Sequence, residues 1–243
     1  YKLNEGGKNS KYFFKKALNI ISKRKNFNLK NTLIQKASKK SLVTLPKKII
    51  SLLHFGRSGT GLLHSLIDNH SQVTTLPSIY FSEYFDENTW TKIIAGGLEE
   101  MIERFILGYP VFFDSRLPDP VPSINMEKIG SLGIKEGMTN LGKNRNEYLY
   151  IDKGLFRKEL KSLMNLHNNI NPLNFFKMIH IAFERTIGNV KNKNIIFYHI
   201  HNPDTYAKLN FVRLAPDTKW LMMVRNPIES CESWTSVPYK NNN

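Results

Sequence analysis

The segment from Lys47 to His70, KKIISLLHFGRSGTGLLHSLIDNH, constrains the fold of this chain more than any other. An apolar run over Lys48–Phe55 predicts a buried strand that ends at Gly56. The following residues, Thr60–Asn69, have the periodicity of a helix. Its predicted apolar face consists of Leu62, Leu63, Leu66 and Ile67. A strand, a glycine-rich turn and a helix in this order are typical of loops that hold phosphate groups on backbone amides.

Predicted strands and helices alternate along most of the chain after Pro46. Further strands are expected at Val73–Leu76, Asn194–Ile200 and Lys219–Val224. Helices are expected at Thr89–Leu107, Leu155–Asn168, Pro172–Ile187, near Asp204–Leu209 and from Pro227 onward. Such alternation predicts an α/β fold with a doubly wound parallel sheet, whose ligands bind at the carboxyl ends of the strands.

The basic charge of the chain is concentrated at its beginning. Residues 1–48 hold 14 of the 35 Lys and Arg residues and one acid, Glu5, whereas the other residues hold 21 basic and 19 acidic side chains. Residues 1–48 therefore carry +13 of the net charge of +15, and we expect no nucleic-acid partner for the core. We divide the chain into a basic leader, residues 1–45, and an α/β domain, residues 46–243.

The leader has two interpretations. Phe13, Phe14, Leu18 and Ile21 recur at near-helical spacing, which allows a basic amphipathic helix that meets an anionic membrane surface. A solvated linker rich in Lys and Asn fits the same composition. No run reaches the roughly 20 apolar residues of a membrane span, and Cys231 is the single cysteine. We expect a cytoplasmic protein that can associate with a membrane.

The glycine turn lacks two working parts of an ATP-binding loop. Gly56 and Gly61 have the spacing of the motif G-x-x-x-x-G-K-[ST]. However, Leu62 occupies the position of the lysine, and Leu63 that of the hydroxyl that binds Mg²⁺. A kinase or NTPase is thus the least favoured interpretation.

What remains in the turn is an anion site that needs no metal. Backbone amides at a helix N-terminus, the hydroxyls of Ser58 and Thr60 and the guanidinium of Arg57 can face an anion together. Transfer of a sulfuryl group fits this set, because that group carries less charge than a phosphoryl group.

The residues FGRSGTGLLHSLIDNH resemble the 5′-phosphosulfate loop of the sulfotransferases that use 3′-phosphoadenosine 5′-phosphosulfate (PAPS), most closely in the style of bacterial and carbohydrate-type members. A second segment, TKWLMMVRNPIESCESW, matches their 3′-phosphate motif, in which an Arg after a strand is followed eight residues later by a Ser. Arg225 and Ser233 have this spacing, and Asn226 and Pro227 are suited to cap and start a helix. The resemblance covers roughly residues 47–76 and 194–236.

The resemblance implies a P-loop-like phosphosulfate loop and a set of donor-binding residues. These are Arg57, Ser58, Gly59, Thr60, Gly61, Arg225 and Ser233. Gly61 departs from the pattern, since many members have a second Thr there. Members also continue well past the second motif, so we expect the domain to be incomplete at its C-terminus.

Two residues compete for the role of general base. His201 follows a predicted strand, where cytosolic sulfotransferases carry Lys-x-His, although His199 replaces the Lys. Glu83 lies in SIYFSEYF, and several carbohydrate and tyrosyl-protein sulfotransferases take a Glu from this region. Its aromatic neighbours would raise the pKa of a carboxyl group by desolvation, or they would simply pack in the core. The histidine pair also allows a zinc site without an evident third ligand, or a structural hydrogen bond.

The sequence thus favours a metal-free, in-line transfer of a sulfuryl group from PAPS to a hydroxyl of a carbohydrate, lipid or phenol. Arg57, Glu83 and His201 are the candidate catalytic residues, with Glu83 slightly preferred as the base. The alternative is a non-catalytic protein that binds a nucleotide or an anionic glycan.

Overall fold

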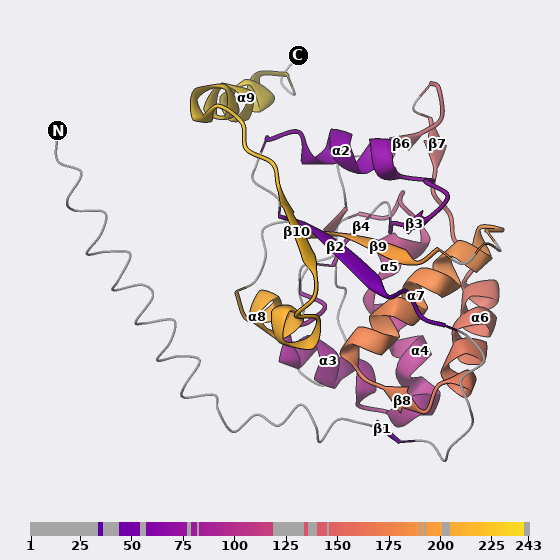
Figure 1. The fold of residues 1–243 in the computed structure, drawn as a ribbon. Coiled ribbons are helices and arrows are strands. Elements are labelled where there is room, and N and C mark those ends of the chain that lie inside the picture. The colour runs from indigo at the N-terminus through magenta and orange to yellow at the C-terminus, as the bar shows by residue number, and fades with distance from the viewer. Residues whose placement is uncertain are drawn as a thin grey trace, which may run out of the picture.

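The computed structural model describes residues 34–35, 44–53, 57–76, 79–81, 83–118, 134–135, 140–144, 146–189, 191, 193–200 and 205–240. Its main sheet has four parallel strands in the order β10-β2-β9-β3 (Figure 1). They are β2 (Lys48–Leu53), β3 (Val73–Thr74), β9 (Ile195–Ile200) and β10 (Lys219–Met222). The predicted α/β fold with a parallel sheet is confirmed.

Short antiparallel pairs of strands surround this sheet. They are β1 (Ile34–Gln35) with β8 (Asn169–Ile170), β4 (Ile79–Tyr80) with β5 (Ile134–Lys135), and β6 (Asn140–Leu141) with β7 (Glu147–Tyr148). Because β1 lies within the predicted leader, residues 1–45, part of that segment is attached to the body of the protein.

The described part of the chain forms eight helices. They are α2 (Thr60–Ile67), α3 (Glu87–Ile94), α4 (Gly97–Gly108), α5 (Pro110–Phe113), α6 (Lys153–Leu166), α7 (Pro172–Thr186), α8 (Thr205–Leu214) and α9 (Pro227–Lys240). The prediction of one continuous helix over Thr89–Leu107 is wrong, because the helix is interrupted between α3 and α4. Gly97 has a φ of 73°, in the left-handed region that glycine tolerates, so the chain changes direction where α4 begins.

Helices cover both faces of the main sheet, as expected for a doubly wound arrangement. On one face, the ring of Tyr198 in β9 lies 5.1 Å from that of Phe211 in α8. On the other face, the ring of His199 lies 5.6 Å from that of His64 in α2. The alternation of side chains along β9 therefore divides its residues between the two layers.

The predicted apolar face of α2 is only partly correct, since Leu63 and Ile67 are half-buried. Leu62 and Leu66 are 66% and 73% exposed, whereas Thr60 and His64 are buried. The helix is rotated so that Thr60 and His64 face the sheet, where the His64 ring packs on that of His199 in β9. Hydrophobic periodicity could not reveal the rotation, because leucines lie on both sides of the buried stripe.

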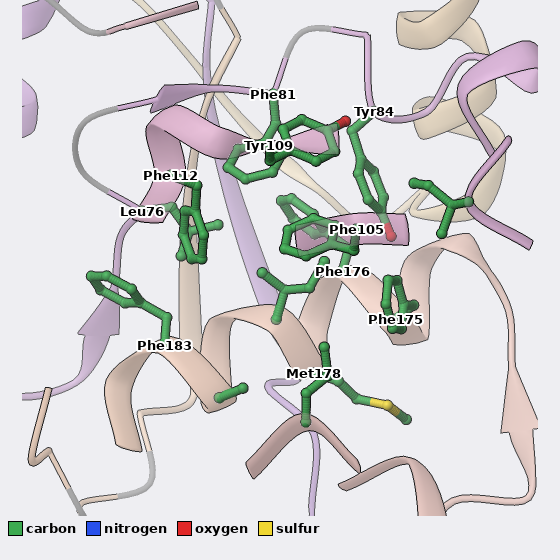
Figure 2. Close-up of a cluster of buried hydrophobic side chains, with 14 of the residues drawn as sticks. Leu76, Phe81, Tyr84, Phe105, Tyr109, Phe112, Phe175, Phe176, Met178 and Phe183 are labelled. Atoms are coloured by element: carbon green, nitrogen blue, oxygen red, sulfur yellow. The ribbon is translucent and has the colours of Figure 1, made fainter. Parts of the chain in front are cut away.

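An aromatic core fills the space between the sheet and the helices α4 to α7 (Figure 2). The ring of Phe105 in α4 lies 6.0 Å from that of Phe156 in α6 and 5.9 Å from that of Phe175 in α7. Phe81 and Tyr84 enter the same core from the segment after β4. These neighbours of Glu83 are thus packing residues.

His180 is the least exposed of the described histidines. His180 of α7 is 1% exposed, and its Nδ1 lies 3.2 Å from the Oγ1 of Thr74 in β3. Burial lowers the pKa of His180 to about 3, because the imidazolium would lose its hydration. The ring is therefore neutral at physiological pH.

The strand order creates a switch point at the carboxyl ends of the strands. The connection that leaves β2 passes over β9 to reach β3, whereas the connection that leaves β9 passes over β2 to reach β10. Because the two connections diverge, a crevice is expected where β2 and its neighbours end, and the turns after β2 and β10 lie there.

Candidate functional site

The turn after β2 has an unusual backbone. Arg57 has a φ of 59° and Gly59 a φ of 88°, so both lie in the left-handed region. Glycine adopts this conformation freely, whereas a residue with a Cβ atom loses about 1 kcal/mol or more. The carbonyl of Gly59 accepts the first helical hydrogen bond of α2, from the amide of Leu63 at 3.1 Å. The chain therefore turns sharply into α2.

The side chains of the turn divide between the interior and the solvent. Ser58 and Thr60 are buried, whereas the Arg57 side chain is exposed. The N-cap residue of α2 is Gly59, so no side chain caps the first amides of the helix. Amides at such a position attract anions through their partial positive charge. The position that carries lysine in ATP-binding loops holds the exposed Leu62.

Arg225 joins the second motif to the first. Its Nη1 donates to the carbonyl oxygen of Arg57 at 3.3 Å, and its Nε donates to Oε2 of Glu229 at 3.0 Å. The contact with Arg57 spans 168 residues of sequence. The structure thus brings together two motifs that the sequence suggested only through a resemblance.

Helix α9 begins as its sequence predicts. The Oδ1 atom of Asn226 accepts a hydrogen bond from the amide of Ile228 at 2.9 Å, and Pro227 is the first residue of the helix. Figure 1 shows α2 and α9 near the end of the sheet where β2 and β10 finish. The two helices therefore flank the pair of arginines.

Helix α9 also supplies an aromatic face to the site. The Cζ atom of Arg57 lies 5.3 Å from the centre of the Trp234 ring, a cation–π distance. Ser233, the residue before Trp234, is half-buried. Within the described ranges, no hydrogen bond joins the Ser233 side chain to Arg57 or Arg225.

Glu83 lies on the face of the sheet that carries Tyr198. It is half-buried, and Tyr198 and Tyr109 near it are fully buried. Burial raises the pKa of both tyrosines well above 10, and the negative charge of Glu83 raises it further. The carboxyl group therefore faces two phenols that are never ionised at physiological pH.

The histidine candidates are placed differently. His199 is buried against α2, on the face of the sheet opposite Tyr198 and Glu83. His201 lies outside the described residues. Among the residues that are described, no group of three or more His, Cys, Asp or Glu side chains could hold a metal ion.

Three residues of this region were not predicted from the sequence. Glu229 stands four residues after Arg225, a spacing that favours an ion pair on a helix and could have revealed it. Trp234 follows Ser233 directly, but its position over Arg57 depends on how α9 leaves the sheet. Tyr109 had no sequence signal, because only the packing of α4 brings it to Glu83.

Comparison with protein-family models, curated proteins and solved structures finds no match for this chain. Among the described helices, none combines the length and the apolar character needed to cross a membrane.

Proposed function

We propose that this protein transfers a sulfuryl group from PAPS to an acceptor hydroxyl without a metal. The observation that carries the proposal is the hydrogen bond from Arg225 to the Arg57 carbonyl. It joins a strained turn at a helix N-terminus to a second arginine at the switch point of the sheet. Two guanidinium groups and a row of amides suit a ligand that bears two separate anionic groups, as PAPS does.

In the proposed reaction, the acceptor oxygen forms a bond to sulfur while the bond from sulfur to the phosphate oxygen breaks. The exposed guanidinium of Arg57 would neutralise the negative charge that grows on the bridging oxygen. The amides of residues 58–61 would hold the 5′-phosphate, and Arg225 and Ser233 the 3′-phosphate. The acceptor proton would pass to Glu83, with His201 as the alternative base.

Two other functions give different results in simple assays. An NTPase needs a lysine and a hydroxyl where this chain has Leu62 and Leu63, and Leu62 is exposed at the start of α2. A non-catalytic protein that binds a nucleotide or an anionic glycan would use the same two arginines. Only transfer to an acceptor distinguishes it from the proposed enzyme.

Ligand-dependent thermal stability tests the donor site. Adenosine 3′,5′-bisphosphate at about 100 times its dissociation constant should raise the free energy of unfolding by about 2.7 kcal/mol. ATP with Mg²⁺ should stabilise the protein much less. Equal or stronger stabilisation by ATP with Mg²⁺ would favour an NTPase. Incubation with labelled PAPS and a panel of glycans, lipids and phenols then tests transfer.

Substitutions at the two arginines should separate binding from turnover. Arg225→Ala should weaken binding of the bisphosphate, both through the lost guanidinium and through the lost support of the Arg57 carbonyl. Arg57→Ala should lower kcat more than it weakens binding, because the negative charge that Arg57 would neutralise grows on the bridging oxygen only in the transition state. Arg213→Ala is the control, since this exposed arginine lies on α8, away from the site. Equal losses for Arg213→Ala would show a general charge effect.

A further inference from the structure

Tyr109 is a buried polar residue near the proposed base, and it has no assigned role. It follows α4 and is 0% exposed. Its ring centre lies 4.9 Å from that of Phe81 and 4.9 Å from that of Phe105. With an aromatic ring packed on each of these sides, the direction of the Tyr109 hydroxyl is fixed by the core.

This hydroxyl points toward the turn that contains Glu83. Figure 2 shows the Tyr109 oxygen beside the start of the Tyr84 side chain, in the segment that follows Glu83. Two backbone hydrogen bonds hold that segment, from the amide of Tyr84 to the carbonyl of Phe81 at 3.1 Å and from the amide of Asp86 to that of Glu83 at 2.9 Å. Backbone hydrogen bonds thus hold the chain on both sides of Glu83.

The Tyr109 hydroxyl needs an acceptor. Among the described residues, it has no hydrogen-bond partner of standard geometry. A hydroxyl buried without a partner destabilises a protein by about 1–3 kcal/mol. The Glu83 carboxyl lies near enough that its charge and its capacity to accept a hydrogen bond raise the pKa of Tyr109, after the larger effect of burial. A rotation of the half-buried Glu83 side chain would complete the bond.

The neighbouring buried tyrosines already have acceptors. The hydroxyl of Tyr84 donates to the carbonyl of Pro172 at 3.0 Å, and that of Tyr198 donates to the carbonyl of Phe81 at 2.8 Å. Of these three phenols, Tyr109 alone retains a donor for Glu83.

We propose that Tyr109 is a positioning residue whose hydroxyl donates to the Glu83 carboxylate and orients it for proton abstraction. This inference rests on the proposed function, with Glu83 as the base. The hydrogen bond would hold one carboxylate oxygen against the core and leave the other to accept the proton of the substrate hydroxyl. Such a donor also favours the ionised form of the carboxyl group, which is the form that acts as a base.

The test compares Tyr109→Phe with Tyr84→Phe in the full chain. Both changes remove one buried hydroxyl from the same core, but only Tyr109 faces Glu83. NMR of selectively labelled glutamate side chains, assigned with Glu83→Gln, measures the Glu83 titration without any need for activity. Tyr109→Phe should raise the measured pKa of Glu83 by about one unit relative to the unmodified chain, whereas Tyr84→Phe should leave it unchanged.

Kinetics supply the second measurement. In Tyr109→Phe, kcat should fall about tenfold with little change in the KM for PAPS, and the acid limb of the pH profile should move with the Glu83 titration. An unchanged Glu83 titration, or an equal shift in Tyr84→Phe, would overturn the positioning role. A shift confined to Tyr109→Phe in a protein that transfers no sulfuryl group would confirm the hydrogen bond and refute the proposed function.

Discussion

Replacing His180 should change how the stability of this protein depends on pH. The imidazole has a pKa of about 3 in the folded protein and 6.5 in the unfolded chain. Between these values the unfolded chain binds the proton and the folded protein does not. The free energy of unfolding therefore falls as the pH decreases below 6.5, and this loss continues until the pH approaches 3.

The magnitude follows from the two pKa values. Integration of the linkage relation from pH 7 to pH 5 gives a loss of about 2 kcal/mol from His180 alone. His180→Asn removes the titrating group, and its amide can still bond to the hydroxyl of Thr74. The variant can be less stable than the parent at pH 7, because Asn is smaller than His. Its further loss between pH 7 and pH 5 should nevertheless be smaller than that of the parent by about 2 kcal/mol.

Urea unfolding at the two pH values gives each free energy by linear extrapolation. His70→Asn is the matched control, since His70 is exposed and the chemical change is the same. It should keep the pH dependence of the parent. The same pH dependence in His180→Asn and in the parent would show that the ring becomes protonated inside the folded protein, against the argument from burial.

Three further predictions concern other parts of the molecule. Gly59→Ala and Gly188→Ala should each lower the free energy of unfolding by about 1 kcal/mol, because the φ angles of these glycines are 88° and 86°. Only Gly59→Ala should weaken the binding of adenosine 3′,5′-bisphosphate measured by calorimetry. Equal affinities in both variants would argue against the turn as the anion site. Lys193→Met should lower the free energy of unfolding by about 3–5 kcal/mol in urea titrations, because it leaves the buried Glu184 without its cation. Arg104→Met, at a more exposed ion pair, should have little effect. A loss below about 1 kcal/mol in Lys193→Met would show that water reaches Glu184. Deletion of residues 1–32, which precede β1, should abolish salt-sensitive co-sedimentation with anionic vesicles, and failure of the intact chain to bind them would remove the membrane interpretation of the leader.

The strands of the main sheet could be predicted from the sequence, because each is a short apolar run bounded by turn residues. The strand at Ile195–Ile200 has the predicted end and nearly the predicted start. Helix α9 was equally accessible, since Asn226 and Pro227 specify its beginning locally. Features that a few neighbouring residues determine could thus be predicted from the sequence.

Features that depend on tertiary packing could not be predicted from the sequence. The rotation of α2 buries His64 rather than Leu62, and only the contact with β9 decides this. The contact between Arg225 and Arg57 followed from a resemblance, since no local rule joins residues 168 positions apart. The position of Tyr109 near Glu83 likewise depends on the path from α4 to α5.

The central position of β2 also governs the order in which this protein can assemble. Its two neighbours in the sheet, β9 and β10, are synthesised long after it, so an emerging chain must carry an apolar strand without partners for most of its synthesis. Folds dominated by such distant pairings form slowly, because the entropy cost of closing a large loop comes before any stabilising contact between the strands. The arginine pair is completed only when β10 docks, and binding competence should therefore be among the last properties that a refolding chain regains.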